Sequence, residues 1–265
     1  MKLGVGQSLP EVAVRGSGMD AGAAALIARM SVPPPPERAR LIDRLARTLR
    51  EAGIWAKLAA LHVMAAHDAQ AARLNWIGSS YALAPAGRPG FTPDRGYAGD
   101  GAASYLDTGW APSMGAQDSL CFGIWYQTSA VSSSSIAGTA APGGGSSVKL
   151  APRVTSASNG FAAAANMTDW IVFGPAPADT GLFLVNRSSA TGTQGYHNGV
   201  MLGSTAALSE APTSRTLHLG RSNIDTPFYN SARMAAAVIG RSLDSVEQAA
   251  LHAALAAYLT SVGAA

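Results

Sequence analysis

The spacing of apolar residues changes from a helical period to a strand period near residue 54. In residues 19–53 apolar side chains recur every three or four positions, as they do on the buried face of a helix. Asp20 can cap a first helix, the proline run 33–36 separates it from a second one, and Gly53 stands where a C-cap glycine belongs. The pattern therefore predicts a helical segment at 19–53.

The stretch that follows fits both periods. Residues 55–66 are apolar enough for a helix, yet residues 61–64 also fit a buried strand, and both alternatives stay open. Residues 68–76 are rich in alanine, which is the strongest helix former, and they predict a short helix.

From residue 81 onward short apolar runs alternate with turn residues. Asn198-Gly199 lies between two such runs and predicts a hairpin, because both residues tolerate the positive φ that a two-residue turn requires. Short strands at this spacing predict a mainly β fold, an antiparallel two-sheet jelly-roll sandwich rather than a parallel α/β sheet. Strands are expected at residues 105–108, 120–128, 135–139, 147–151, 160–166, 169–173, 182–186, 194–197, 200–202, 216–219 and 234–239.

The end of the chain predicts a C-terminal helix. Asp244 and Glu247 have the spacing of a capping box, in which each side chain accepts from a free amide of the first turn. Leu251, Leu255 and Leu259 then share one face. This helix is expected to pack against the outside of the sandwich.

Composition narrows the classes of function. Charged residues make up only 13% of the 265 residues, about half the usual share, so much of the surface must consist of small and uncharged polar side chains. Such surfaces suit burial against neighbouring subunits, and we expect a homo-oligomer. The net charge of +3 gives no support to nucleic-acid binding. The single Cys121 excludes an intramolecular disulfide and is expected to be a buried thiol.

Membrane insertion and secretion are not expected either. No apolar run approaches the roughly 18 residues that a membrane span requires. Residues 1–10 lack the apolar core of a secretory signal, so assembly in a cytoplasm is expected.

Three segments, taken in chain order, resemble concanavalin A-like, laminin-G-like jelly rolls. Residues 91–101, followed by Tyr105 to Thr108, resemble the Gly-Asp-Gly turn and Tyr-rich strand with which those domains open. Tyr196 to Gly199 resembles their hairpin, and residues 237–247 resemble their last strand, short link and terminal helix. The resemblance covers residues 54–265.

Two further segments, 53–58 and 67–76, make the chain similar to the lectin-fold virion proteins of tailed bacteriophages, prophages and gene transfer agents. The resemblance implies a concanavalin A-like sandwich at 54–265, preceded by an extended anchoring arm at 1–18 and the helical segment at 19–53.

As function, the resemblance implies a non-enzymatic structural component of a phage-like particle, such as a tail, fibre, spike or capsid decoration protein. The protein would be assembled in the bacterial cytoplasm and located in the virion. Residues 1–53 would contact other virion proteins, a trimer is the favoured oligomer, and the sandwich would face host surface polysaccharide for host attachment. Two alternatives stay open: a free carbohydrate-binding module or adhesin, and a polysaccharide depolymerase.

Catalysis is not expected. Glucanases of this fold carry an acidic Glu-x-Asp-x-x-Glu cluster, because glycoside hydrolysis requires paired carboxylates. No such cluster, serine nucleophile elbow or zinc-protease histidine pair is found in the sequence. The acidic residues of 110–240 are scattered, at Asp118, Asp169, Asp179, Glu210 and Asp225.

No cofactor is expected. Asp94, Asp100 and Asp107 could supply oxygen ligands for Ca²⁺, as in some laminin-G relatives. Turn formation explains these three residues equally well, because Asp side chains accept from nearby backbone amides.

Sugar binding is the favoured chemistry, and it combines aromatic faces with polar side chains on loops. The alternative role for each aromatic candidate is packing in a core or an interface. On the second helix Arg40, Arg44 and Arg47 form a stripe that is either solvated or a docking face for an acidic partner. The candidate glycan-binding residues, taken as exposed, are Trp110, Asp107, Tyr196, His197, Asn186, Arg187 and Tyr229.

Overall fold

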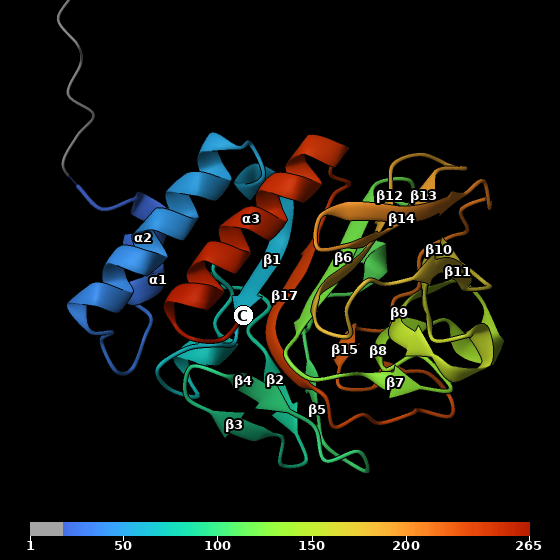
Figure 1. Cartoon of the computed structure of the whole chain (residues 1–265), viewed down its shortest axis with the longest axis horizontal. Coiled ribbons are helices and arrows are strands. Elements are labelled where there is room, and N and C mark those ends of the chain that lie inside the picture. Colours follow the sequence, from blue (N-terminus) through green and yellow to red (C-terminus); the bar gives the residue numbers. More distant parts are fainter. Residues whose placement is uncertain (1–17) are drawn as a thin grey trace, which may run out of the picture.

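The computed structural model of the chain describes residues 18–265 (Figure 1). The anchoring arm expected at residues 1–18 therefore lies outside the described residues, apart from Gly18. Within the described residues three α-helices gather on one side of two β-sheets, with the C-terminal helix next to β1 and β17 (Figure 1).

The three helices begin where the sequence predicts. Helix α1 (Ala21–Ile27) is capped by Asp20, which accepts from the backbone amides of its first turn. Helix α2 (Pro36–Glu51) has a proline at its start, and Gly53 follows it at φ +72°. Helix α3 (Ser245–Ser261) has both hydrogen bonds of the capping box.

Sheet A has eight strands in the order β14–β13–β12–β6–β17–β4–β3, and β1 pairs with β17 beside β4. All of its pairs are antiparallel. Its strands are β1 (Leu58–Val63), β3 (Gly90–Thr92), β4 (Gly96–Ala98), β6 (Leu120–Tyr126), β12 (Gly181–Arg187), β13 (Thr193–His197), β14 (Val200–Thr205) and β17 (Arg233–Gly240).

Sheet B has nine strands in the order β11–β10–β9–β8–β15–β5–β2, with β7 beside β9 and β16 beside β8 in parallel. The predicted antiparallel two-sheet sandwich is therefore confirmed, and each expected strand has a counterpart. The strands of sheet B are β2 (Ala84–Ala86), β5 (Tyr105–Asp107), β7 (Val131–Ser132), β8 (Ala137–Ala140), β9 (Ser147–Val154), β10 (Gly160–Met167), β11 (Ile171–Pro175), β15 (His218–Leu219) and β16 (Ser222–Asn223).

The ambiguous stretch after Gly53 consists of a single turn of 3₁₀ helix followed by strand β1, so the strand alternative is the correct one. The prediction of a short helix at 68–76 is wrong, because within this stretch only Ala71–Arg73 is helical and it forms a single 3₁₀ turn. The cause is a competing set of hydrogen bonds. Asn75 uses its side-chain oxygen to accept from the amides of Leu61 and Ile77, which fixes the chain in an extended path against β1.

Two hydrophobic cores share sheet A, one on each of its faces. Along β6, Phe122 and Ile124 point between the sheets, whereas Cys121 and Trp125 point toward the helices. The helical core also contains Leu49 of α2, together with the leucines of α3. Cys121 is buried as expected, and this burial, with a smaller contribution from the charge of Glu247, raises the pKa of its thiol to about 12.

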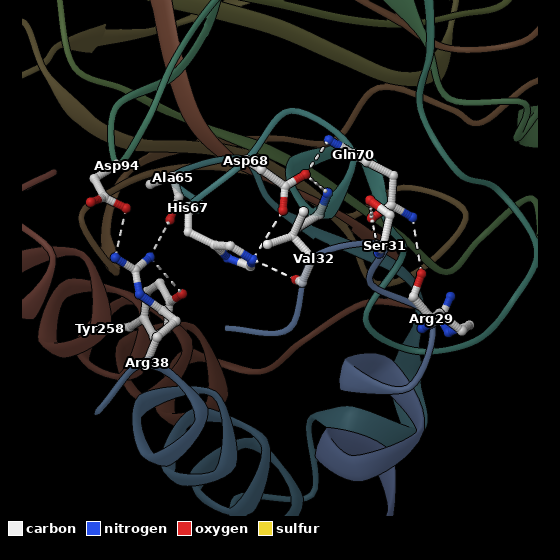
Figure 2. Close-up of polar contacts among 11 residues, drawn as sticks. Arg29, Ser31, Val32, Arg38, Ala65, His67, Asp68, Gln70, Asp94 and Tyr258 are labelled. Atoms are coloured by element: carbon white, nitrogen blue, oxygen red, sulfur yellow. Dashed lines mark hydrogen bonds and ion pairs between the residues drawn. The ribbon is translucent and has the colours of Figure 1, made fainter. Parts of the chain in front are cut away.

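A polar network ties the segment between α1 and α2 to the sandwich (Figure 2). Gln70 donates to the carbonyl of Arg29 and accepts from the amide of Ser31, both at 3.0 Å. Arg38 donates to the carbonyl of Ala65 at 3.1 Å and forms a 2.6 Å ion pair with Asp94. The helices therefore share both a core and a polar seam with the sheets.

Candidate functional site

Four of the predicted glycan-binding residues lie on β12 and β13 and are buried: Asn186, Arg187, Tyr196 and His197. The expectation that they are exposed is wrong. Both strands lie inside sheet A, where one face packs in the sandwich core and the other lies under α3. Asn186 accepts from the amide of Leu243 at 2.9 Å, and His197 donates to the carbonyl of Thr180 at 2.9 Å, so their polar atoms serve internal contacts.

Arg187 is an internal tie rather than a ligand contact. Its guanidinium is fully buried and donates to the carbonyls of Ala165, Ser189, Ala190 and Ala207. Burial lowers its pKa. These bonds hold the β12–β13 connection and the segment after β14 against β10.

Trp110 is also buried, in the core between the sheets, and its expected exposure is wrong. Asp107 and Tyr229 differ from the other candidates because both are half-exposed. They belong to one group of side chains, which we call the aromatic cluster: Tyr105, Asp107, His218, Arg221 and Tyr229.

The aromatic cluster is held together by stacking and hydrogen bonds. Tyr105 stacks on His218 with the ring centroids 4.5 Å apart, and the guanidinium of Arg221 lies 4.1 Å from the centroid of Tyr105. Arg221 donates to Nδ1 of His218 at 3.1 Å and to the hydroxyl of Tyr229 at 2.8 Å. Nε2 of His218 therefore carries the proton, and it lies 3.5 Å from Asp107. Although burial opposes ionisation, the hydrogen bonds to Asp107 from its neighbours hold the pKa of its carboxyl below the usual value.

A trough lies on the outer face of sheet B. It consists of two hollows, of about 300 and 230 Å³, which have Gly144, Lys149 and Ile224 in common. The trough is lined by Ser134, Ser135, Ala140, Ala141, Gly144, Lys149, Thr168, Asp169, Trp170, Ile224, Asp225, Thr226 and Phe228.

Three elements position the main side chains of the trough. Lys149 points outward from β9 because Val148 and Leu150, on either side of it, point into the sandwich core. Trp170 comes from the β10–β11 turn and packs on a small cluster that contains Ala151 and Ala162.

Phe228 belongs to the loop that follows β16, and its side chain is 43% exposed. That loop is anchored by Asp225, which accepts from the amide of Gly143 at 3.0 Å and forms a 2.7 Å ion pair with Arg215. These two contacts hold the pKa of Asp225 below its usual value.

The ammonium group of Lys149 makes no hydrogen bond or ion pair with the described residues, 18–265. Burial lowers its pKa, and the negative charge of Asp169 partly offsets this effect. The trough thus combines aromatic side chains, hydroxyl groups and a half-buried cation.

Only partial signals for this site are present in the sequence. Phe228 adjoins the predicted Tyr229, and Asp169 and Asp225 are among the scattered acidic residues. Lys149 and Trp170 were missed. The alternation of polar and apolar residues along β9 could have identified Lys149 as outward-facing, whereas the position of Trp170 depends on how its turn folds over the sheet.

Within residues 18–265 no group of three or more His, Cys, Asp or Glu side chains could hold a metal ion. Each carboxylate considered for Ca²⁺ has another contact. Asp94 pairs with Arg38, Asp107 meets His218, and Asp100 accepts from three successive backbone amides of its own turn. Among the described helices, none is both long and apolar enough to cross a membrane.

Comparison with known proteins identifies the fold. No protein-family profile and no curated protein sequence matches the chain. Domain 4 of AbnA, an extracellular arabinanase from Geobacillus stearothermophilus in complex with arabinotriose, is similar in structure, with a TM-score of 0.52, 12% identity, and coverage of 74% of this chain and 98% of that domain.

The Trypanosoma rangeli sialidase in complex with sialic acid is also similar, with a TM-score of 0.53 and 12% identity over 83% of this chain. The match spans only 39% of the sialidase. At such low identity these likenesses concern the fold alone, and both agree with a lectin-like β-sandwich.

Proposed function

We propose that this protein binds carbohydrate, without cleaving it, in the trough on the outer face of sheet B. The observation that carries the proposal is the pairing of two aromatic side chains, Trp170 and Phe228, with polar groups around Lys149 in one concave surface. Ligand sites typically combine apolar walls with a few polar groups that fix orientation. Sugar rings have apolar faces and hydroxyl edges, which match both parts.

Two carboxylates of this face, Asp107 and Asp225, favour binding over hydrolysis. A glycosidase needs a general acid whose pKa is raised so that it stays protonated near neutral pH. Asp107 and Asp225 have lowered pKa values, because hydrogen bonds and ion pairs favour their charged forms. Neither side chain is therefore suited to donate a proton to a leaving group.

Substitution of an exposed aromatic side chain tests the proposal. We expect the purified protein to bind members of a panel of bacterial surface polysaccharides, and the Phe228→Ala variant to bind them at least about fivefold more weakly. The scale is the roughly 1–3 kcal/mol that a nucleic-acid base gains by stacking on an aromatic side chain. Leu208→Ala is the matched control, because Leu208 is 70% exposed and lies outside the trough lining. Binding that Phe228→Ala leaves unchanged would overturn the assignment of the trough. Release of reducing ends from a bound polysaccharide would instead favour a depolymerase.

We further propose that the sandwich is a structural, host-attachment component of a phage-like particle, anchored through residues 1–53. This part rests on the sequence resemblance and on the character of the helical layer. A hollow of about 410 Å³ lies between α2 and α3, and Arg44 is the one charged residue in its lining. The guanidinium of Arg44 has no ion pair within residues 18–265.

Helix α3 supports docking at this hollow. Its 17 residues include one charged residue, Glu247, which already forms a 2.6 Å ion pair with Lys57. The outer side of the helix is therefore uncharged, with Ala253 and Ala257 exposed beside the hollow. An apolar groove flanked by an unpaired arginine fits an amphipathic helix that carries an acidic residue, here assigned to another virion protein.

Particle incorporation tests this assignment. We expect Arg44→Glu to reduce the amount of protein in purified particles, because it would place two like charges at the contact. Arg88→Glu makes the same change in charge at an exposed arginine far from α2 in the sequence. Equal incorporation of both variants would contradict docking at α2. Self-association of the pure protein that Arg44→Glu disrupts would identify a second copy as the occupant.

A further inference from the structure

We propose that the trough selects saccharides that carry an anionic group, such as a carboxylate, phosphate or sulfate, which binds the ammonium group of Lys149. This inference rests on the proposed function and names the class of ligand. Its starting point is the position of Lys149, which lines both hollows of the trough.

Lys149 differs from the other cations near it. Arg153, four residues further along β9, is ion-paired with Asp179. Arg215 is ion-paired with Asp225 at 2.7 Å. Lys149 alone of these three has no such partner among the described residues.

An unpaired and half-buried ammonium group is unfavourable for the protein alone. Burial has removed part of the water around its charge, and the lowered pKa of Lys149 reflects this loss. No internal carboxylate among the described residues lies at contact distance to replace that water. A ligand anion would supply the missing charge. The attraction is stronger there than at an open surface, because the surroundings of Lys149 screen charge less than water does.

The charges around the trough indicate which hollow takes the anion. In the smaller hollow Asp169 lines the wall, and the carboxylate of Glu210 accepts from the hydroxyl of Thr168 at 2.6 Å. Two carboxylates there would repel an anion. In the larger hollow the one carboxylate is Asp225, whose charge is already met by Arg215.

The anionic group therefore belongs in the larger hollow, between Lys149 and Phe228. The uncharged remainder of the saccharide would extend into the smaller hollow over Trp170. Such a ligand carries a single negative charge per repeat near Lys149, because a second one would meet Asp169.

Matched charged and neutral polymers test this selection. The probes are polygalacturonate and its carboxyl-reduced form, together with lightly sulfated dextran and unmodified dextran, so that carboxylate and sulfate ester are compared separately and each repeat carries at most one charge. For the wild-type protein we expect at least tenfold tighter binding of a charged polymer than of its neutral counterpart. Lys149→Gln should remove that preference, and Lys149→Arg should retain most of it.

Two controls separate the trough from general attraction of polyanions to a basic protein. Arg88→Gln removes an exposed cation that is absent from the trough lining and should leave the preference unchanged. Phe228→Ala should weaken binding of charged and neutral polymers alike. Circular dichroism of each variant confirms that it is folded.

The outcomes distinguish this inference from the proposed function. Saccharide binding that shows no preference for charge, or a preference that survives Lys149→Gln, would overturn the role of Lys149 and leave carbohydrate binding intact. An absence of binding to these four polymers and to the whole polysaccharide panel would overturn both.

Discussion

The two outer faces of the sandwich differ in what covers them. The outer face of sheet A lies under the helices, and all seven residues of β6 are buried. None of the three α-helices within residues 18–265 lies over the outer face of sheet B, and on β9 Lys149 and Arg153 remain half-exposed. The comparison teaches that the helices close the central strands of sheet A to a ligand from outside, so the buried polar residues of these strands stabilise the fold. Lys149 on sheet B remains accessible.

Matched truncations on the two faces provide the strongest test of this contrast. We predict that Leu255→Ala, in the core beneath α3, lowers the free energy of unfolding by about 2–5 kcal/mol, because it leaves a cavity in a packed interior. Val172→Ala, at a 45% exposed position on β11, should change it by less than about 0.5 kcal/mol. Urea denaturation at neutral pH measures both. Similar losses from the two variants would mean that the face of sheet B is also covered.

The dependence of the free energy of unfolding on pH tests the interior of sheet A, the sheet that the helices cover. His62 of β1 is fully buried and donates from Nε2 to the carbonyl of Tyr81, and burial lowers its pKa from 6.5 to about 4. The unfolded chain therefore binds a proton at a higher pH than the folded one does. Stability from this group is fully present above pH 6.5 and is lost as the pH falls toward 4, by on the order of 3 kcal/mol.

Urea midpoints measured between pH 7 and pH 4 check this prediction. The His62→Leu variant should lose much of the acid sensitivity, because its side chain does not titrate. His67→Leu is the control, since His67 lies near the polar seam at the α1–α2 connection rather than in the interior. Burial also lowers the pKa values of His197 and His252, so some loss of the same sign should persist. A profile that His62→Leu leaves unchanged would contradict the prediction.

The smallest expected effect concerns how firmly α3 covers sheet A. Asp244 accepts from the amides of Val246 and Glu247, both at 2.9 Å. We predict that Asp244→Ala costs about 1 kcal/mol, while Asp244→Ser, which keeps an oxygen acceptor, costs only a few tenths. Hydrogen exchange of the first-turn amides of α3 should rise in the alanine variant alone. Faster exchange in both variants would show that the charge of Asp244, rather than its capping, matters.

Sequence periodicity was sufficient for much of the fold. Helix caps at Asp20 and Asp244, the Asn198-Gly199 hairpin and the main strands depend on local chemistry, and the structure contains them. The failure at residues 68–76 has a long-range cause, since Asn75 bonds to β1 in place of a helical neighbour. Short pieces such as β3 and β16 were missed because two or three residues carry almost no periodic signal.

The candidate site was less predictable than the fold. Arg187 and His197 look like exposed polar positions in the sequence, and only the packing of Arg187 on β10 and of His197 against Phe183 shows that they are internal. Trp170 and Phe228 come from two separate connections and line the two neighbouring hollows of the trough, and no local sequence pattern reports that these connections lie on one surface. Physical reasoning from sequence therefore found the elements and could not assign the faces.

The buried thiol of Cys121 has a practical consequence. It is the only cysteine in the chain, and it lies on the central strand β6 beneath the helical layer. With a pKa of about 12 it holds almost no thiolate at neutral pH, so alkylating reagents should leave the native protein unmodified. A dye attached to a cysteine introduced on the rim of the trough would therefore report ligand binding without background from Cys121. Slow modification of Cys121 itself would measure the rate at which the helices separate from the sheet.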